Sequence, residues 1–140
     1  MKQVVLDACV FSKQFLDESD SPQAKALIEK LVKHKIQILV PHLFVYEVLA
    51  TLNTARYSIT DGYQIITVLQ KSNLLNVVEL NSVYLNIISE ICQTGHIKSG
   101  FPSFYDTSYH ALAVFYDCYF VTADKRHFAK TSHLGNRPLA

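Results

Sequence analysis

Two pieces of sequence decide how this chain folds: FYDTSYHALAVFY at residues 104–116 and VTAD at residues 121–124. The first predicts a helix with Asp106 in its first turn. The second predicts the end of a buried strand, with Asp124 just beyond it. Two carboxylates carried by adjacent elements, both next to apolar sequence, suggest a metal site. The question is whether the rest of the chain brings more acids to the same place.

The bulk properties of the chain favour one globular domain over residues 1–140. The composition is 49% hydrophobic and 18% charged, which excludes a disordered chain. A formal net charge of +1 is too small to mark a general binder of nucleic acids or membranes. No apolar run approaches the roughly 18 residues that a membrane span needs, and the opening run is too short for a signal peptide. We therefore expect a cytoplasmic protein without membrane contact.

Cysteine and histidine show no pattern of a zinc site. Cys9, Cys92 and Cys118 form no CxxC pair, so we expect three reduced and mostly buried thiols. The six histidines show no close-paired spacing such as HxxxH, which argues against a zinc enzyme. We expect His110 to be a packed or hydrogen-bonding residue and not a general acid.

Strands and helices alternate along the chain. Short β-branched and apolar runs predict strands at residues 3–6, 36–40, 76–80 and 119–121. Apolar residues at spacings of three and four predict helices at residues 8–16, 22–34, 41–52, 61–70, 82–94 and 104–116. Pro41 is expected to begin the third of these helices, and Thr60 to cap the fourth. The alternation implies an α/β fold with a parallel sheet and right-handed crossovers.

Two acids in the first half of the chain stand at informative positions. Asp7 directly follows the first strand, so it either lies where open α/β sheets gather ligands or simply caps the next helix. Glu47 is the one ionisable acid between residues 40 and 52 and has apolar neighbours. Because an unpaired buried carboxylate is costly, Glu47 either points to solvent or faces inward to a cation.

Asp106 and Asp124 also have plain structural readings, since the first fits a capping box begun by Ser103 and the second fits a helix cap. Taken together, however, the acids fit a shared site better. In a parallel sheet the strand ends before Asp7 and Asp124 lie on one edge, and the helix carrying Glu47 starts from that edge. Four carboxylates in one place would repel strongly without a cation, and oxygen ligands select Mg²⁺ or Mn²⁺.

Four segments of the chain resemble the acidic motifs of PIN-domain (PilT N-terminal) ribonucleases, especially the VapC-type toxins of type II toxin–antitoxin pairs. The segments are VLDA at 5–8, VP at 40–41 with YEV at 46–48, YDTSY at 105–109 with ALA at 111–113, and VTADK at 121–125. Thr122 keeps the small polar residue expected before the last acid. Cys9 departs from the family, which often has Ser or Asn at that position.

The resemblance implies a three-layer α/β/α sandwich around a central, mainly parallel sheet of four to five strands. It also implies an endoribonuclease that cleaves single-stranded or structured RNA by metal-activated water, with Mg²⁺ or Mn²⁺ as cofactor. The catalytic and metal-binding residues would be Asp7, Glu47, Asp106 and Asp124. The residues expected to contact RNA are Lys125, Arg126 and His96. As a toxin the protein would form a homodimer and bind a cognate antitoxin.

Other functions stay open on the sequence alone. The chain could be a PIN-domain RNA-processing nuclease without an antitoxin, or a non-catalytic PIN-like module that binds RNA or a protein. A phospho-accepting α/β signalling domain ranks last, because Lys125 directly follows Asp124 and does not stand at a separate strand end.

Overall fold

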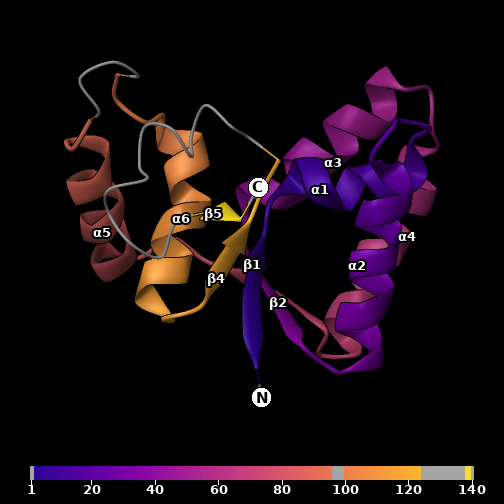
Figure 1. The fold of residues 1–140 in the computed structure, drawn as a ribbon, viewed down its shortest axis with the longest axis horizontal. Helices are drawn as coiled ribbons and strands as arrows, with labels where there is room; N and C mark the ends of the chain where they lie inside the picture. Colours follow the sequence, from indigo (N-terminus) through magenta and orange to yellow (C-terminus); the bar gives the residue numbers. More distant parts are fainter. Residues whose placement is uncertain (1, 96–99, 124–137, 140) are drawn as a thin grey trace.

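The computed structural model describes residues 2–95, 100–123 and 138–139 and arranges them in three layers (Figure 1). The middle layer is a parallel sheet with the strand order β3-β2-β1-β4-β5. Its strands are β1 (Gln3–Leu6), β2 (Gln37–Pro41), β3 (Leu75–Val78), β4 (Tyr119–Val121) and β5 (Pro138–Leu139). The predicted sandwich with a sheet of four to five strands is confirmed.

Helices cover both faces of this sheet. Helices α5 and α6 lie on one side of it, and α1, α2, α3 and α4 lie on the other (Figure 1). Their bounds are α1 (Ala8–Ser12), followed by the 3-10 turn η1 (Lys13–Phe15), then α2 (Ser21–Lys33), α3 (Leu43–Thr54), α4 (Ile59–Lys71), α5 (Ser82–Cys92) and α6 (Phe104–Phe115). In the described part of the chain, no helix has the length and apolar character that a membrane crossing requires.

The core explains why the strands read as continuous apolar runs. The central strands are covered on both faces, and Val5, Leu6 and Leu39 are fully buried. On the α1–α3 side, Phe11 packs edge-on against Phe44 with 5.1 Å between ring centroids. The buried sheet is therefore the framework from whose end the candidate side chains project.

Three local predictions are wrong. Pro41 is the last residue of β2 and does not begin α3, which starts at Leu43; a strand end tolerates proline because few ladder hydrogen bonds are lost there. Helix α4 is capped by Ser58 and not by Thr60, since the Ser58 hydroxyl accepts a hydrogen bond from the backbone N–H of Asp61 at 3.2 Å. The helix expected at residues 8–16 is divided between α1 and η1.

Phe44 tests how strongly the aromatic core stabilises the fold. Its side chain is fully buried, so Phe44→Ala is expected to lower the free energy of unfolding by about 3–5 kcal/mol through lost burial and a residual cavity. Urea unfolding measures the change. The matched control is Tyr63→Ala on α4, where the ring is 54% exposed and the loss should stay below about 0.5 kcal/mol. Equal losses in the two variants would contradict this view of the core.

Candidate functional site

The carboxyl ends of β1 and β4 are joined where the first candidate acid stands. The backbone N–H of Asp7 donates to the carbonyl of Val121 at 3.0 Å. Helix α6 packs against β1, β2 and β4, and α1 packs against α3. The sheet edge at the end of β1 is therefore bordered by the early turns of α3 and α6, which carry Glu47 and Asp106.

Asp7 is both a helix cap and the first acid of the site. It is 8% exposed, and its Oδ1 accepts a hydrogen bond from the backbone N–H of Cys9 at 3.2 Å as the cap of α1. Its Oδ2 accepts a hydrogen bond from the buried Thr122 hydroxyl at 2.7 Å. The predicted helix cap is confirmed, and the role of Asp7 as a ligand stays a prediction.

Glu47 faces inward and not into open solvent. The residue is half-buried, and its Oε1 accepts a hydrogen bond of 2.5 Å from the hydroxyl of Tyr109. Burial raises the pKa of the Glu47 carboxyl, the charges of Asp7 and Asp106 raise it further, and the Tyr109 hydrogen bond lowers it. Two further candidate acids, Asp7 and Asp106, thus lie within electrostatic reach of Glu47.

Asp106 takes the position predicted for it in the first turn of α6. The Ser103 hydroxyl caps the helix by accepting a hydrogen bond from the backbone N–H of Asp106 at 3.1 Å. The residue is half-buried, and its charge contributes to the raised pKa of Glu47. Asp106 therefore stands at a capped, positively polarised helix end that favours a carboxylate.

The remaining predicted residues divide into two groups. Thr122 is described and lies 2% exposed against Asp7. The predicted fourth acid and the three predicted RNA contacts lie outside the described residues, so their positions stay predictions. They are Asp124, Lys125, Arg126 and His96.

The three described carboxylates suit a hard divalent cation by their chemistry, because they supply oxygen donors whose mutual repulsion a cation would relieve. Over residues 2–95, 100–123 and 138–139, however, no three His, Cys, Asp or Glu side chains stand close enough to hold a metal ion by themselves. A cation at this edge would therefore need further oxygen ligands, such as water or the carboxylate of Asp124.

Cys9 departs from the prediction of mostly buried thiols, because the residue is exposed while Cys92 and Cys118 are half-buried. Burial of its thiol and the adjacent Asp7 carboxylate nevertheless raise the pKa of the thiol to about 12. The thiol is thus protonated at neutral pH beside Asp7.

Tyr109 is the site residue that the sequence analysis missed. It follows Asp106 by three residues, so the two side chains share one face of α6. This spacing from Asp106 is visible in the sequence, but it does not reveal that the Tyr109 hydroxyl contacts Glu47 on α3. His110 was correctly predicted to be packed, since it is fully buried and stacks on Phe120 at 6.2 Å between ring centroids.

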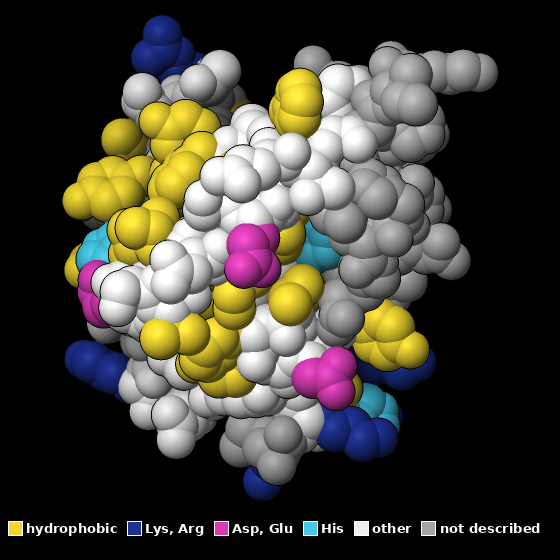
Figure 2. Space-filling model, turned by 90° about the vertical axis from the view of Figure 1, so that its left-hand side faces the viewer, with side chains coloured by type: hydrophobic (Ala, Val, Ile, Leu, Met, Phe, Trp, Pro, Cys, Tyr) yellow, Lys and Arg dark blue, Asp and Glu magenta, His cyan; other side chains and the backbone are white. Residues whose placement is uncertain are grey.

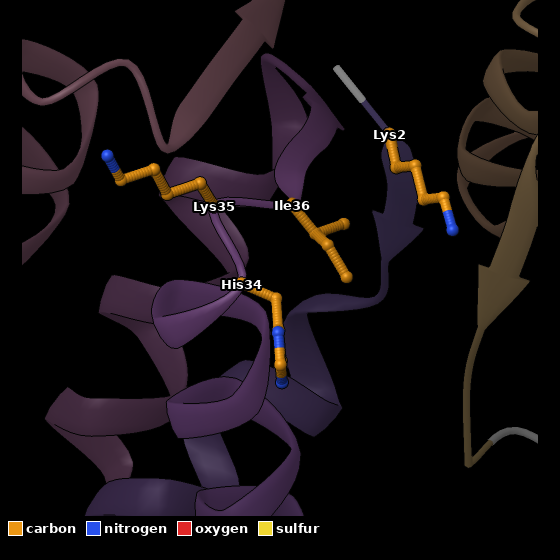
Figure 3. Close-up of a pocket in the computed structure, with 4 residues that line it drawn as sticks. All are labelled: Lys2, His34, Lys35 and Ile36. Carbon is orange, nitrogen blue, oxygen red and sulfur yellow. The ribbon is translucent and has the colours of Figure 1, made fainter.

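A separate recess lies at the opposite end of the sheet, where β1 and β2 begin. Lys2, His34, Lys35 and Ile36 line it (Figure 3). The ammonium groups of Lys2 and Lys35 repel a metal ion, and the single imidazole of His34 is too few ligands to hold one. This recess is therefore a poor candidate for the metal site.

The α5–α6 side of the molecule carries exposed hydrophobic side chains, which gather into patches in Figure 2. The segment just before α6 contributes Phe101, which is 67% exposed. Exposed apolar patches of this kind are typical of surfaces that bind another protein. The exposed members on α5 and α6 are Val83, Leu85, Phe104, Tyr105, Val114 and Phe115.

Comparison with known proteins gives a family match and several fold matches. The sequence matches the family model described as PIN domain over residues 4–134. No curated protein matches the sequence. A toxin–antitoxin complex from Klebsiella pneumoniae has a similar structure, with a TM-score of 0.67 and 13% identity over 98% of this chain and 96% of that chain.

Two further solved structures share the fold at the same low identity. VapBC2 from Rickettsia felis, bound to a DNA fragment from its promoter, has a TM-score of 0.69 and 13% identity over 99% of this chain and 97% of that chain. VapC20 from Mycobacterium tuberculosis, described as a toxin that cleaves the sarcin–ricin loop, has a TM-score of 0.63 and 13% identity over 86% of this chain and 91% of that chain.

Thr122→Val tests the hydrogen bond that holds Asp7. Valine keeps the shape of threonine but leaves a buried carboxylate oxygen without this donor, so the free energy of unfolding should fall by about 1–3 kcal/mol. Thr122→Ser retains the hydroxyl and should lose less than about 1 kcal/mol. Urea unfolding at pH 7 measures both variants, and identical losses would rule out the hydrogen bond as the cause.

Glu47→Gln tests the electrostatic strain at the site. Because the pKa of Glu47 is raised in the folded state, the wild type loses stability as the pH rises through that pKa and the carboxyl ionises. In EDTA at pH 7 the glutamine variant should therefore melt at a higher temperature than the wild type. The gain should vanish below about pH 4, where glutamate is protonated in both folded and unfolded chains. A pH-independent difference in melting temperature would contradict this assignment.

Proposed function

We propose, from the premise that this chain belongs to the PIN domain family, that it is a metal-dependent endoribonuclease. The observation that carries the proposal is that Glu47 points inward to the Tyr109 hydroxyl at 2.5 Å, where burial and then the charges of Asp7 and Asp106 raise the pKa of its carboxyl. An acid held in partly buried, negatively charged surroundings destabilises the folded chain, and such a cost is typical of a functional site.

The carboxylates of Asp7, Glu47 and Asp106, together with Asp124, would hold Mg²⁺ or Mn²⁺. When bound, such an ion lowers the pKa of water and neutralises charge on a scissile phosphate. The chain's own contribution is to hold its acids in place. Thr122 fixes one oxygen of Asp7, and the cap of α6 fixes the backbone at Asp106. Without a cation, the same acids would repel an RNA backbone.

The proposed substrate is RNA, single-stranded or structured. In single strands and loops of RNA the bases are accessible to a protein. The description of VapC20 as cleaving the sarcin–ricin loop supports RNA as the substrate class. Lys125, Arg126 and His96 are the proposed contacts to the phosphates or bases.

The proposed cellular role is that of a toxin in a type II toxin–antitoxin pair. Two structural neighbours are named as a toxin–antitoxin complex and as VapBC2 bound to promoter DNA. The exposed apolar side chains on α5 and α6 are suited to a protein partner (Figure 2). A homodimer and a cognate antitoxin are the partners proposed.

Asp106→Asn tests the nuclease directly. The substitution removes one charged ligand but keeps the backbone N–H that Ser103 caps, so RNA cleavage with Mg²⁺ should fall by more than about 100-fold with little change in melting temperature. Cleavage is followed on a labelled RNA in Mg²⁺, Mn²⁺ and EDTA.

The matched control for this assay is Asp117→Asn, an exposed acid that follows α6 at its far end. Asp117 has a φ of 51°, a backbone conformation that asparagine also tolerates. The control should cleave like the wild type. Wild-type activity in Asp106→Asn would refute the assignment, and a wild type inactive in both metals would instead favour a binding module.

A further inference from the structure

Tyr109 is a buried polar residue to which the proposed chemistry assigns no role. It is 1% exposed, and its ring stacks almost parallel on Phe120, with 5.9 Å between centroids and 6° between planes. A buried hydroxyl needs a hydrogen-bond partner. Here the partner is the carboxylate of Glu47, 62 residues away along the chain, at 2.5 Å.

The Tyr109 hydroxyl connects three elements at one point. The ring belongs to α6, the carboxylate that it contacts belongs to α3, and the backbone of Ala8 at the start of α1 lies near the hydroxyl. Ala8 is the neighbour of Asp7, and Tyr109 lies one turn after Asp106 on the same helix face. The hydroxyl therefore contacts Glu47 and lies within electrostatic reach of Asp7.

Glu47 needs such an anchor more than the two aspartates do. Its side chain is longer, and rotamer freedom must be lost to hold it in one place. Asp7 and Asp106 also repel it, and this repulsion favours rotamers that turn the carboxylate outward. A hydrogen bond of 2.5 Å from a neutral hydroxyl to a carboxylate is charge-assisted and strong, and it opposes both effects.

We propose that Tyr109 is a positioning residue that holds Oε1 of Glu47 and leaves Oε2 available to a divalent cation. The inference rests on the proposed function, because it assigns Tyr109 a role in preparing the same metal site. A purely structural role would make the hydroxyl a satisfied core group with no effect on the cation. The two roles predict different metal affinities for a variant that lacks the hydroxyl.

The test is Tyr109→Phe, which removes the hydroxyl and keeps the ring that stacks on Phe120. Binding of Mn²⁺ to the purified protein without RNA is measured by electron paramagnetic resonance. Loss of a group that orients a metal ligand typically weakens metal binding 10- to 100-fold, and a weakening of at least about tenfold is expected here.

The matched control is Tyr84→Phe. Tyr84 is also buried, and its hydroxyl also donates to α6, but to the backbone carbonyl of Ser108. This control loses a hydrogen bond from a buried tyrosine to the same helix, α6, but the lost bond involves no acid. The substitution should lower the melting temperature. It should leave the Mn²⁺ affinity within about twofold of the wild type, which is less than the loss expected when a group that orients a metal ligand is removed.

Glu47→Gln identifies the route of the effect. If Tyr109 acts through Glu47, then adding Tyr109→Phe to Glu47→Gln should weaken Mn²⁺ binding little further. Unchanged affinity in Tyr109→Phe, equal losses in Tyr109→Phe and Tyr84→Phe, or additive losses in the double variant would each overturn the proposal.

A metal-free crystal structure of Tyr109→Phe separates this proposal from the proposed function. The Glu47 carboxylate is expected to leave its wild-type position in the variant. A wild type that binds no Mn²⁺ would count against the metal-dependent nuclease, and a displaced Glu47 would still support Tyr109 as its anchor. An unmoved Glu47 would overturn the positioning role in either case.

Discussion

Repulsion among carboxylates is the constraint that this sheet edge must accommodate. Burial raises the pKa of the Glu47 carboxyl, and the charges of Asp7 and Asp106, from two other parts of the chain, raise it further. The hydroxyls of Thr122 and Tyr109 donate hydrogen bonds to Asp7 and Glu47. A neutral donor of this kind holds a carboxylate in place without cancelling its charge, so the acids keep the charge that a divalent cation would bind.

The sheet was predictable because its strands are buried on both faces. Such strands are short apolar runs, and those at residues 3–6 and 119–121 were predicted with the bounds that the structure gives. Helix spacing was equally clear, since each helix buries one apolar stripe. Local ends were less certain. Pro41 fits either a strand end or a helix start, and the packing of β2 beside β3 decides for the strand.

The site was predictable only in outline, because adjacency of strand ends follows from topology whereas side-chain partners do not. Parallel strands bring Asp7 to the edge at the end of β4, and a helix cap places Asp106 in the first turn of α6. The pairing of Tyr109 with Glu47 spans 62 residues and depends on how α3 and α6 pack around the sheet. The exposure of Cys9 likewise depends on how α1 packs, which its sequence neighbours do not reveal.

The central claim is that acids distant in sequence converge to bind one kind of ion. The most direct measurement is anomalous diffraction from crystals of the wild-type protein soaked in Mn²⁺. We expect an anomalous peak beside the carboxylates of Asp7, Glu47 and Asp106, at the carboxyl end of β1. A map with no peak at this edge, under conditions in which the protein cleaves RNA, or with manganese bound only elsewhere, would contradict it.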